Sequence, residues 1–152
     1  MGSLKEILDQ KLKQSMKDRQ EAAVSIYRML LSAIKYREIE IGKALDDSGV
    51  VGVVQKMLKQ ASESIEQFKK GNREDLVKKT EEEVIFLKPF LPEQISLEEV
   101  RNKVKAVVDR LQATSPKQMG EVMKSVTDVL AGRADMKDVS RIVKEFLSGH
   151  KG

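Results

Sequence analysis

Apolar residues recur along the chain at the three- and four-residue spacing of an amphipathic α-helix. The clearest runs are Leu4, Ile7, Leu8 and Leu12, and then Val24, Tyr27, Leu31 and Ile34. No segment keeps the strict alternation of apolar and polar residues that is typical of a half-buried strand. The pattern therefore predicts an all-α protein.

Helix starts are marked by a capping side chain that is followed three residues later by an acidic residue or Gln. These pairs are Ser3 and Glu6, Asp18 and Glu21, Asn72 and Asp75, Ser96 and Glu99, Ser115 and Gln118, and Asp135 and Asp138. A further helix is expected near Asp46 or Asp47, which supplies only the cap. After a first helix near the N-terminus, six more are expected near residues 19–42, 48–70, 73–88, 97–111, 116–130 and 136–148.

Two prolines interrupt the helical pattern after the fourth predicted helix. Pro89 and Pro92 enclose Phe90-Leu91, and a proline favours extended backbone in the residue before it. We therefore expect an N-terminal four-helix bundle over residues 1–91 and a small three-helix C-terminal domain over residues 95–149. A bundle as short as the second has marginal stability on its own.

The composition excludes several kinds of catalytic site. The 152 residues include no Cys and a single histidine, so a disulfide, a thiolate metal site and a thiol nucleophile are excluded. His150 lies in a terminal segment that is expected to fray, which does not suit a catalytic triad. The run Glu81-Glu82-Glu83 spreads around its helix and does not converge on one ion. We predict no catalytic residue, no metal site and no cofactor.

The net charge of +4 is a mild basic excess, which permits contact with phosphates without demanding it. No stretch approaches the roughly 20 apolar residues of a membrane span, and the N-terminus lacks the apolar core of a signal peptide. The sequence therefore predicts a cytoplasmic protein with no membrane contact.

Capping and helix termination explain most residues between 115 and 135, but three residues remain. Lys117 lies at a helix start, where a positive charge opposes the helix dipole. Gly120 lies inside a helix, where it costs about 1 kcal/mol relative to Ala. Arg133 lies in a three-residue turn between two helices, where we expect its side chain in solvent.

These residues and the cations around them form a candidate nucleic-acid-binding surface. A glycine between two lysines on one helix face would let a phosphodiester backbone come close. The alternative, which the sequence leaves equally open, is that Gly120 admits a neighbouring helix. The candidate residues are Lys117, Gly120, Lys124, Arg133, Lys137, Arg141 and Lys144.

A second basic set lies along the second predicted helix. It could follow a phosphate backbone, but a solvated face on a long amphipathic helix is the favoured interpretation. Its members are Arg28, Lys35, Arg37 and Lys43.

Six stretches in fixed order resemble the YqeY family over nearly the whole chain. They are residues 28–35 (RMLLSAIK), 63–68 (ESIEQF), 71–76 (GNREDL), 91–94 (LPEQ), 120–124 (GEVMK) and 132–135 (GRAD). The C-terminal half is similar to the tail domain of GatB, a subunit of the glutamine-dependent tRNA amidotransferase, a carbon-nitrogen ligase. The resemblance implies a helical bundle joined to a small helical domain whose counterpart helps to hold tRNA. It implies no catalytic residues here, because the chemical steps of the amidotransferase reside outside the tail.

Two functions of different classes follow from the sequence. The leading hypothesis is a noncatalytic tRNA-binding or translation-linked accessory module, with tRNA or an amidotransferase-related protein as partner. The alternative is a protein–protein adaptor that uses the bundle face around Tyr27, Leu31 and Phe68 and makes no RNA contact. We expect no amidotransferase activity from the chain alone.

Overall fold

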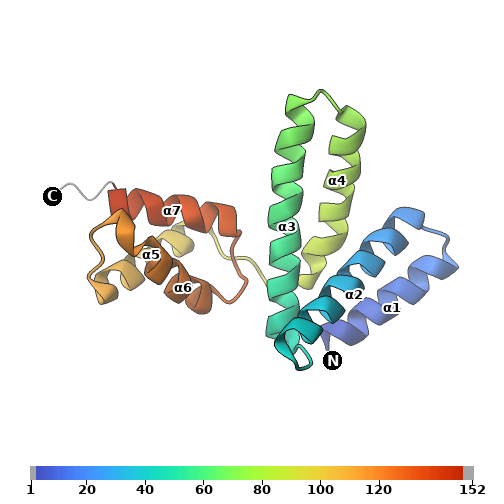
Figure 1. Ribbon diagram of the computed structural model, residues 1–152, viewed down its shortest axis with the longest axis horizontal. Helices are drawn as coiled ribbons and strands as arrows, with labels where there is room; N and C mark the ends of the chain where they lie inside the picture. The colour runs from blue at the N-terminus through green and yellow to red at the C-terminus, as the bar shows by residue number, and fades with distance from the viewer. Residues whose placement is uncertain (1–2, 149–152) are drawn as a thin grey trace. The chain divides into compact units, whose positions relative to one another are not determined.

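The computed structural model describes residues 3–148, and within them it is helical without strands (Figure 1). The all-α prediction is confirmed. The helices are α1 (Leu4–Lys17), α2 (Glu21–Ile41), α3 (Asp47–Lys70), α4 (Glu74–Leu87), α5 (Leu97–Leu111), α6 (Met119–Leu130) and α7 (Met136–Ser148). Two short 3₁₀ turns, η1 (Lys88–Phe90) and η2 (Pro116–Gln118), complete the described elements.

Side-chain caps are present at the predicted starts of α1, α3 and α5. The Ser3 hydroxyl accepts a hydrogen bond from the backbone N–H at the third residue of α1, and Ser96 does the same for α5. The carboxylate of Asp46 accepts from the N–H of Gly49 at 2.9 Å and so caps α3. Each bond satisfies a backbone donor that has no partner inside the helix.

The predicted starts at Asp18 and Asn72 are wrong. Asp18 ends α1, and α2 begins after Gln20 with no side-chain cap. Asn72 has a left-handed φ of 57° in the turn that follows α3, and Arg73 precedes the first residue of α4. In both places the preceding helix ends in a tight turn that takes up the expected capping residue, so the next helix starts later.

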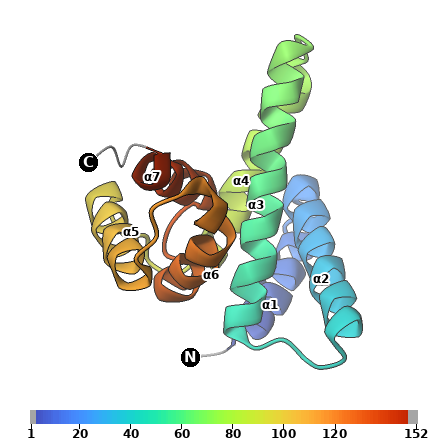
Figure 2. The same ribbon diagram turned by 60° about the vertical axis from the view of Figure 1, so that its left-hand side comes forward.

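Contacts between the elements divide the chain into two compact units, Met1–Leu91 and Pro92–Gly152. In the first, α1 and α2 form one hairpin and α3 and α4 form a second, longer one (Figures 1 and 2). Aliphatic residues such as Leu8, Leu30 and Val54 are fully buried between them.

Tyr27 belongs to this N-terminal core. Its ring lies edge-on to Phe86 and Phe90, with centroid distances of 5.8 and 6.1 Å, and the residue is 6% exposed. Burial raises the pKa of the Tyr27 phenol. The expectation that Tyr27 contributes to a docking surface is therefore wrong, because a partner could not reach it.

In the second unit α5, α6 and α7 pack around valine-rich helix faces. The segment before α5 is tied to the turn between α6 and α7 by two hydrogen bonds. The N–H of Ile95 donates to the carbonyl of Arg133 at 2.9 Å, and the side-chain amide of Gln94 donates to the carbonyl of Gly132 at 3.0 Å. These bonds hold the turn that carries Arg133 in a fixed position within this unit.

Candidate nucleic-acid interface

The start of α6 is built by a capping box. The Ser115 hydroxyl accepts from the N–H of Lys117, and the Gln118 side-chain oxygen accepts from the N–H of Ser115 at 3.2 Å and of Thr114 at 2.8 Å. The predicted capping box is thus confirmed, but it opens the 3₁₀ turn η2, and the α-helix begins only at Met119. The predicted helix over residues 116–130 therefore has two parts.

Gly120 lies at the exposed beginning of α6, between Lys117 and Lys124. A methyl group placed on Gly120 would meet no atom within 4 Å. The alternative that this glycine admits a neighbouring helix is therefore wrong. Open space at this point leaves room for a group from outside the chain to approach the α6 backbone.

Three of the candidate lysines are exposed and make no ion pair with another described residue. They are Lys117 in η2, Lys124 in α6 and Lys144 in α7. Helix α7 packs against η2, so all three are carried by elements that contact one another. Their ammonium groups are available to an external anion.

Arg141 is already engaged within its own helix. Its guanidinium lies 3.6 Å from the Asp138 carboxylate and 3.3 Å from that of Glu145, which also pairs with Arg101 at 3.0 Å. Lys137 is exposed in the first turn of α7, where its N–H donates to the Asp135 carboxylate at 2.8 Å. An external phosphate at Arg141 would have to compete with two carboxylates.

The edge of α6 also carries acidic residues. Glu121 and Asp128 are exposed and stand four residues after Lys117 and Lys124, so these positions share one side of the helix. Their negative charge lowers the local positive potential. The surface is therefore a row of alternating charges with two unpaired lysines, and it suits contacts to individual phosphates.

Arg133 differs from its expected state. The residue is half-buried, and its Nε donates to the carbonyl of Leu130 at 3.2 Å. Its own carbonyl accepts the bond from Ile95 described above. The expectation that its side chain lies in solvent is wrong, because the turn folds it back onto the end of α6. The preceding Ala131 and Gly132 both have left-handed φ values, 47° and 82°, which produce this fold-back.

The remaining described residues add no metal site and no membrane segment to this picture. Residues 3–148 contain no group of three or more carboxylate or histidine side chains placed to hold an ion. No helix in that range is both long and apolar enough to cross a bilayer. His150 lies outside the described residues.

Several relatives with similar sequences come from fungi. An uncharacterized protein of Schizosaccharomyces pombe is 36% identical over 94 residues, which are 62% of this chain and 76% of that protein. The mitochondrial protein named altered inheritance of mitochondria protein 41 is 32% identical in Lachancea thermotolerans, over 90% of this chain and 75% of the relative. In Pyrenophora tritici-repentis the protein of that name is 28% identical, over 90% of this chain and 76% of the relative.

The expected cytoplasmic location is contradicted by these names, which point to mitochondria. Composition and the absence of a long apolar run could not reveal this, because they do not distinguish one aqueous compartment from another.

A family model described as Yqey-like protein matches residues 5–147, nearly the whole described chain. The match includes both helical units and every stretch on which the sequence resemblance rests. The chain therefore belongs to the YqeY-like family.

Proposed function

We propose that this chain is a noncatalytic tRNA-binding accessory module whose C-terminal unit contacts phosphates of the RNA backbone. The observation that carries the proposal is the exposed edge of α6. Lys117 and Lys124 stand there without an ion pair to any described residue, and open space surrounds Gly120 between them. Lysine ammonium groups that neutralise phosphates supply the salt-dependent part of nucleic-acid affinity.

Contacts of this kind would recognise the backbone of an RNA and not its base sequence. Phosphate contacts fix where an RNA lies, whereas sequence is read by contacts to base edges. The segment of residues 115–130, which carries both lysines, contains no aromatic residue and so offers no ring for base stacking. The module would hold a tRNA by its backbone, alone or beside an amidotransferase-related protein, and we assign it no catalytic residue or cofactor.

Both units have a place in this proposal. We propose that they are separate domains, residues 1–91 and residues 95–149, and that Lys144, Lys137 and Arg133 extend the phosphate-binding surface beyond α6. The names of the relatives favour mitochondria as the compartment in which the chain acts.

The test is a titration of the purified full chain with unmodified tRNA and, separately, with duplex DNA of similar charge. We expect tRNA binding that weakens as salt rises, and a severalfold loss in the double variant Lys117→Ala/Lys124→Ala. The matched control is Lys59→Ala/Lys78→Ala, which removes two exposed lysines that make no ion pair with described residues of the N-terminal unit. Absence of tRNA binding, or an equal loss in both double variants, would overturn the proposal.

A further inference from the structure

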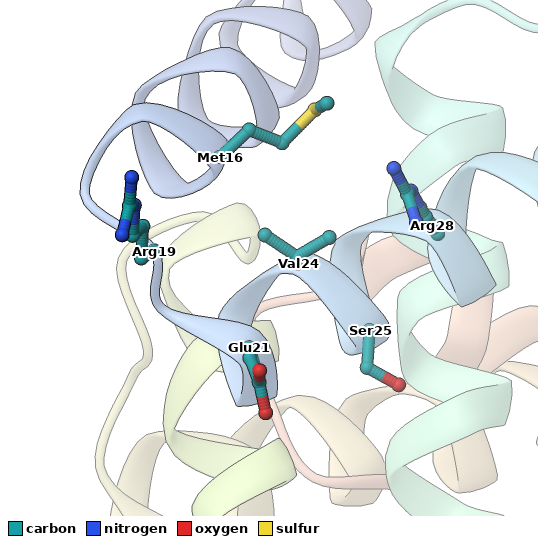
Figure 3. Close-up of a pocket in the computed structure, with 6 residues that line it drawn as sticks. All are labelled: Met16, Arg19, Glu21, Val24, Ser25 and Arg28. Atoms are coloured by element: carbon teal, nitrogen blue, oxygen red, sulfur yellow. The ribbon is translucent and has the colours of Figure 1, made fainter.

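A hollow of about 550 Å³ lies between the end of α1 and the first turns of α2 (Figure 3). It is separate from the lysines of α6, since all of its lining residues belong to the N-terminal unit. They are Met16, Arg19, Glu21, Val24, Ser25 and Arg28.

The hollow has an apolar middle and two cationic ends. Figure 3 shows the Met16 side chain extending from α1 above Val24 of α2, with Arg19 on one side and Arg28 on the other. Met16 is 50% exposed, which is high for a large apolar side chain. Glu21 points away from the space between Met16 and Val24 in the same view.

The side chains of both arginines are available to a ligand. Neither guanidinium makes an ion pair with another described residue, and both residues are exposed. Arg19 is held in the turn between the hairpin helices, and Arg28 is fixed to the rigid helix α2. Guanidinium groups bind carboxylates with two parallel hydrogen bonds, so the two ends are suited to a pair of carboxylates.

We propose that this hollow docks an acidic amphipathic helix of a partner protein. Arg28 stands seven positions after Glu21, the first residue of α2, which is roughly 11 Å along the helix axis, and Arg19 lies in the turn before that residue. Glutamates at positions i and i+7 of a partner helix are roughly 11 Å apart. Their flexible side chains can cover the remaining distance to the two guanidinium groups. Leucines at i+3 and i+4 lie on the same face between them and would contact Met16 and Val24.

A nucleic-acid strand and a second copy of this chain would fit the hollow less well than an acidic helix. A nucleic-acid strand places charge along its full length, whereas the middle of the hollow offers the apolar atoms of Met16 and Val24, and no aromatic ring lines it for stacking. A second copy of the chain, docked through the same surface about a two-fold axis, would bring arginines against arginines. The proposal is independent of RNA binding by the C-terminal unit.

The experiment uses the full chain and a synthetic helical peptide of roughly 18 residues, with Glu at i and i+7 and Leu at i+3 and i+4. We expect binding, about tenfold weaker for Arg28→Glu, and recovery of that loss when Lys replaces only the one peptide Glu that faces position 28. Lys78→Glu, at an exposed position on α4, is the matched control and should leave the affinity unchanged.

A second variant separates binding from folding. Arg19 has a left-handed φ of 54°, which glycine adopts without strain. Arg19→Gly should therefore keep or raise the melting temperature while it weakens peptide binding. Equal affinity for the Glu and Lys peptides, no peptide binding, or displacement of the peptide by a single-stranded RNA in an Arg28-dependent manner would each overturn the proposal.

Discussion

Replacement of Gly120 by Ala should strengthen the fold and weaken RNA binding at the same time. The added methyl would meet no atom within 4 Å, so the C-terminal unit pays no steric penalty. Alanine favours helix over glycine by about 1 kcal/mol in a helix interior. Gly120 is the second residue of α6, where part of that preference is lost, so we expect a gain of about 0.5–1 kcal/mol in the free energy of unfolding.

The same methyl should hinder RNA. It would fill the open space between Lys117 and Lys124 into which a phosphate backbone is proposed to come. We expect a severalfold loss of tRNA affinity in a titration, measured beside denaturant unfolding of the same variant. Gly52→Ala is the matched control, because Gly52 lies in α3 of the other unit and its added methyl also meets nothing within 4 Å.

Two results would refute this reasoning. If Gly120→Ala binds tRNA as tightly as the parent chain, the RNA backbone does not come close to α6 at Gly120. If Gly120→Ala destabilises the chain while Gly52→Ala does not, the space around Gly120 is occupied and the packing described for α6 is incorrect.

Three further variants test other contacts. Asp135→Ala should cost about 1 kcal/mol of stability in thermal unfolding with unchanged tRNA affinity, because its carboxylate accepts a backbone N–H at the start of α7. Arg133→Ala should cost about 0.5–1 kcal/mol, because its hydrogen bond to the Leu130 carbonyl is lost, and an unchanged melting temperature would contradict that bond. A hydrogen bond from Lys5 lowers the pKa of Glu38, so the stability from this carboxylate is present above pH 4.5 and is lost as the pH falls through the lowered value. Glu38→Gln should flatten that acid-side loss in denaturant titrations at neutral and acidic pH, and an unchanged pH profile would contradict the contact.

The sequence predicted helices well where a side chain next to the helix decides its start. Ser96 and Asp135 act on their own first turns, and such local bonds are visible in the spacing of residues. The helix start predicted at Asp18 was wrong because Asp18 ends α1 instead, and the left-handed turn at Arg19 follows it before α2 begins. No local pattern shows which of two adjacent helix ends takes a shared capping residue.

The candidate site was predictable only in part. The exposure of Lys124 follows from its place opposite the apolar face of α6, and Lys117 is exposed in the turn η2 that precedes this helix. The half-buried state of Arg133 depends on the left-handed backbone at Ala131, which alanine rarely adopts, and on the bond from its side chain to the Leu130 carbonyl. The hollow beside Arg28 likewise requires the turn after α1 to bring Arg19 to its other end, which spacing along one helix cannot reveal.

The most direct test of RNA binding by the C-terminal unit is the salt dependence of tRNA affinity. Each phosphate contact adds roughly 0.7–0.9 to the slope of log affinity against log salt. The slope for Lys117→Ala/Lys124→Ala should therefore be shallower than that of the parent chain by about 1.4–1.8, whereas Lys59→Ala/Lys78→Ala should keep the parent slope. Identical slopes for all three proteins would contradict the assignment of phosphate contacts to α6.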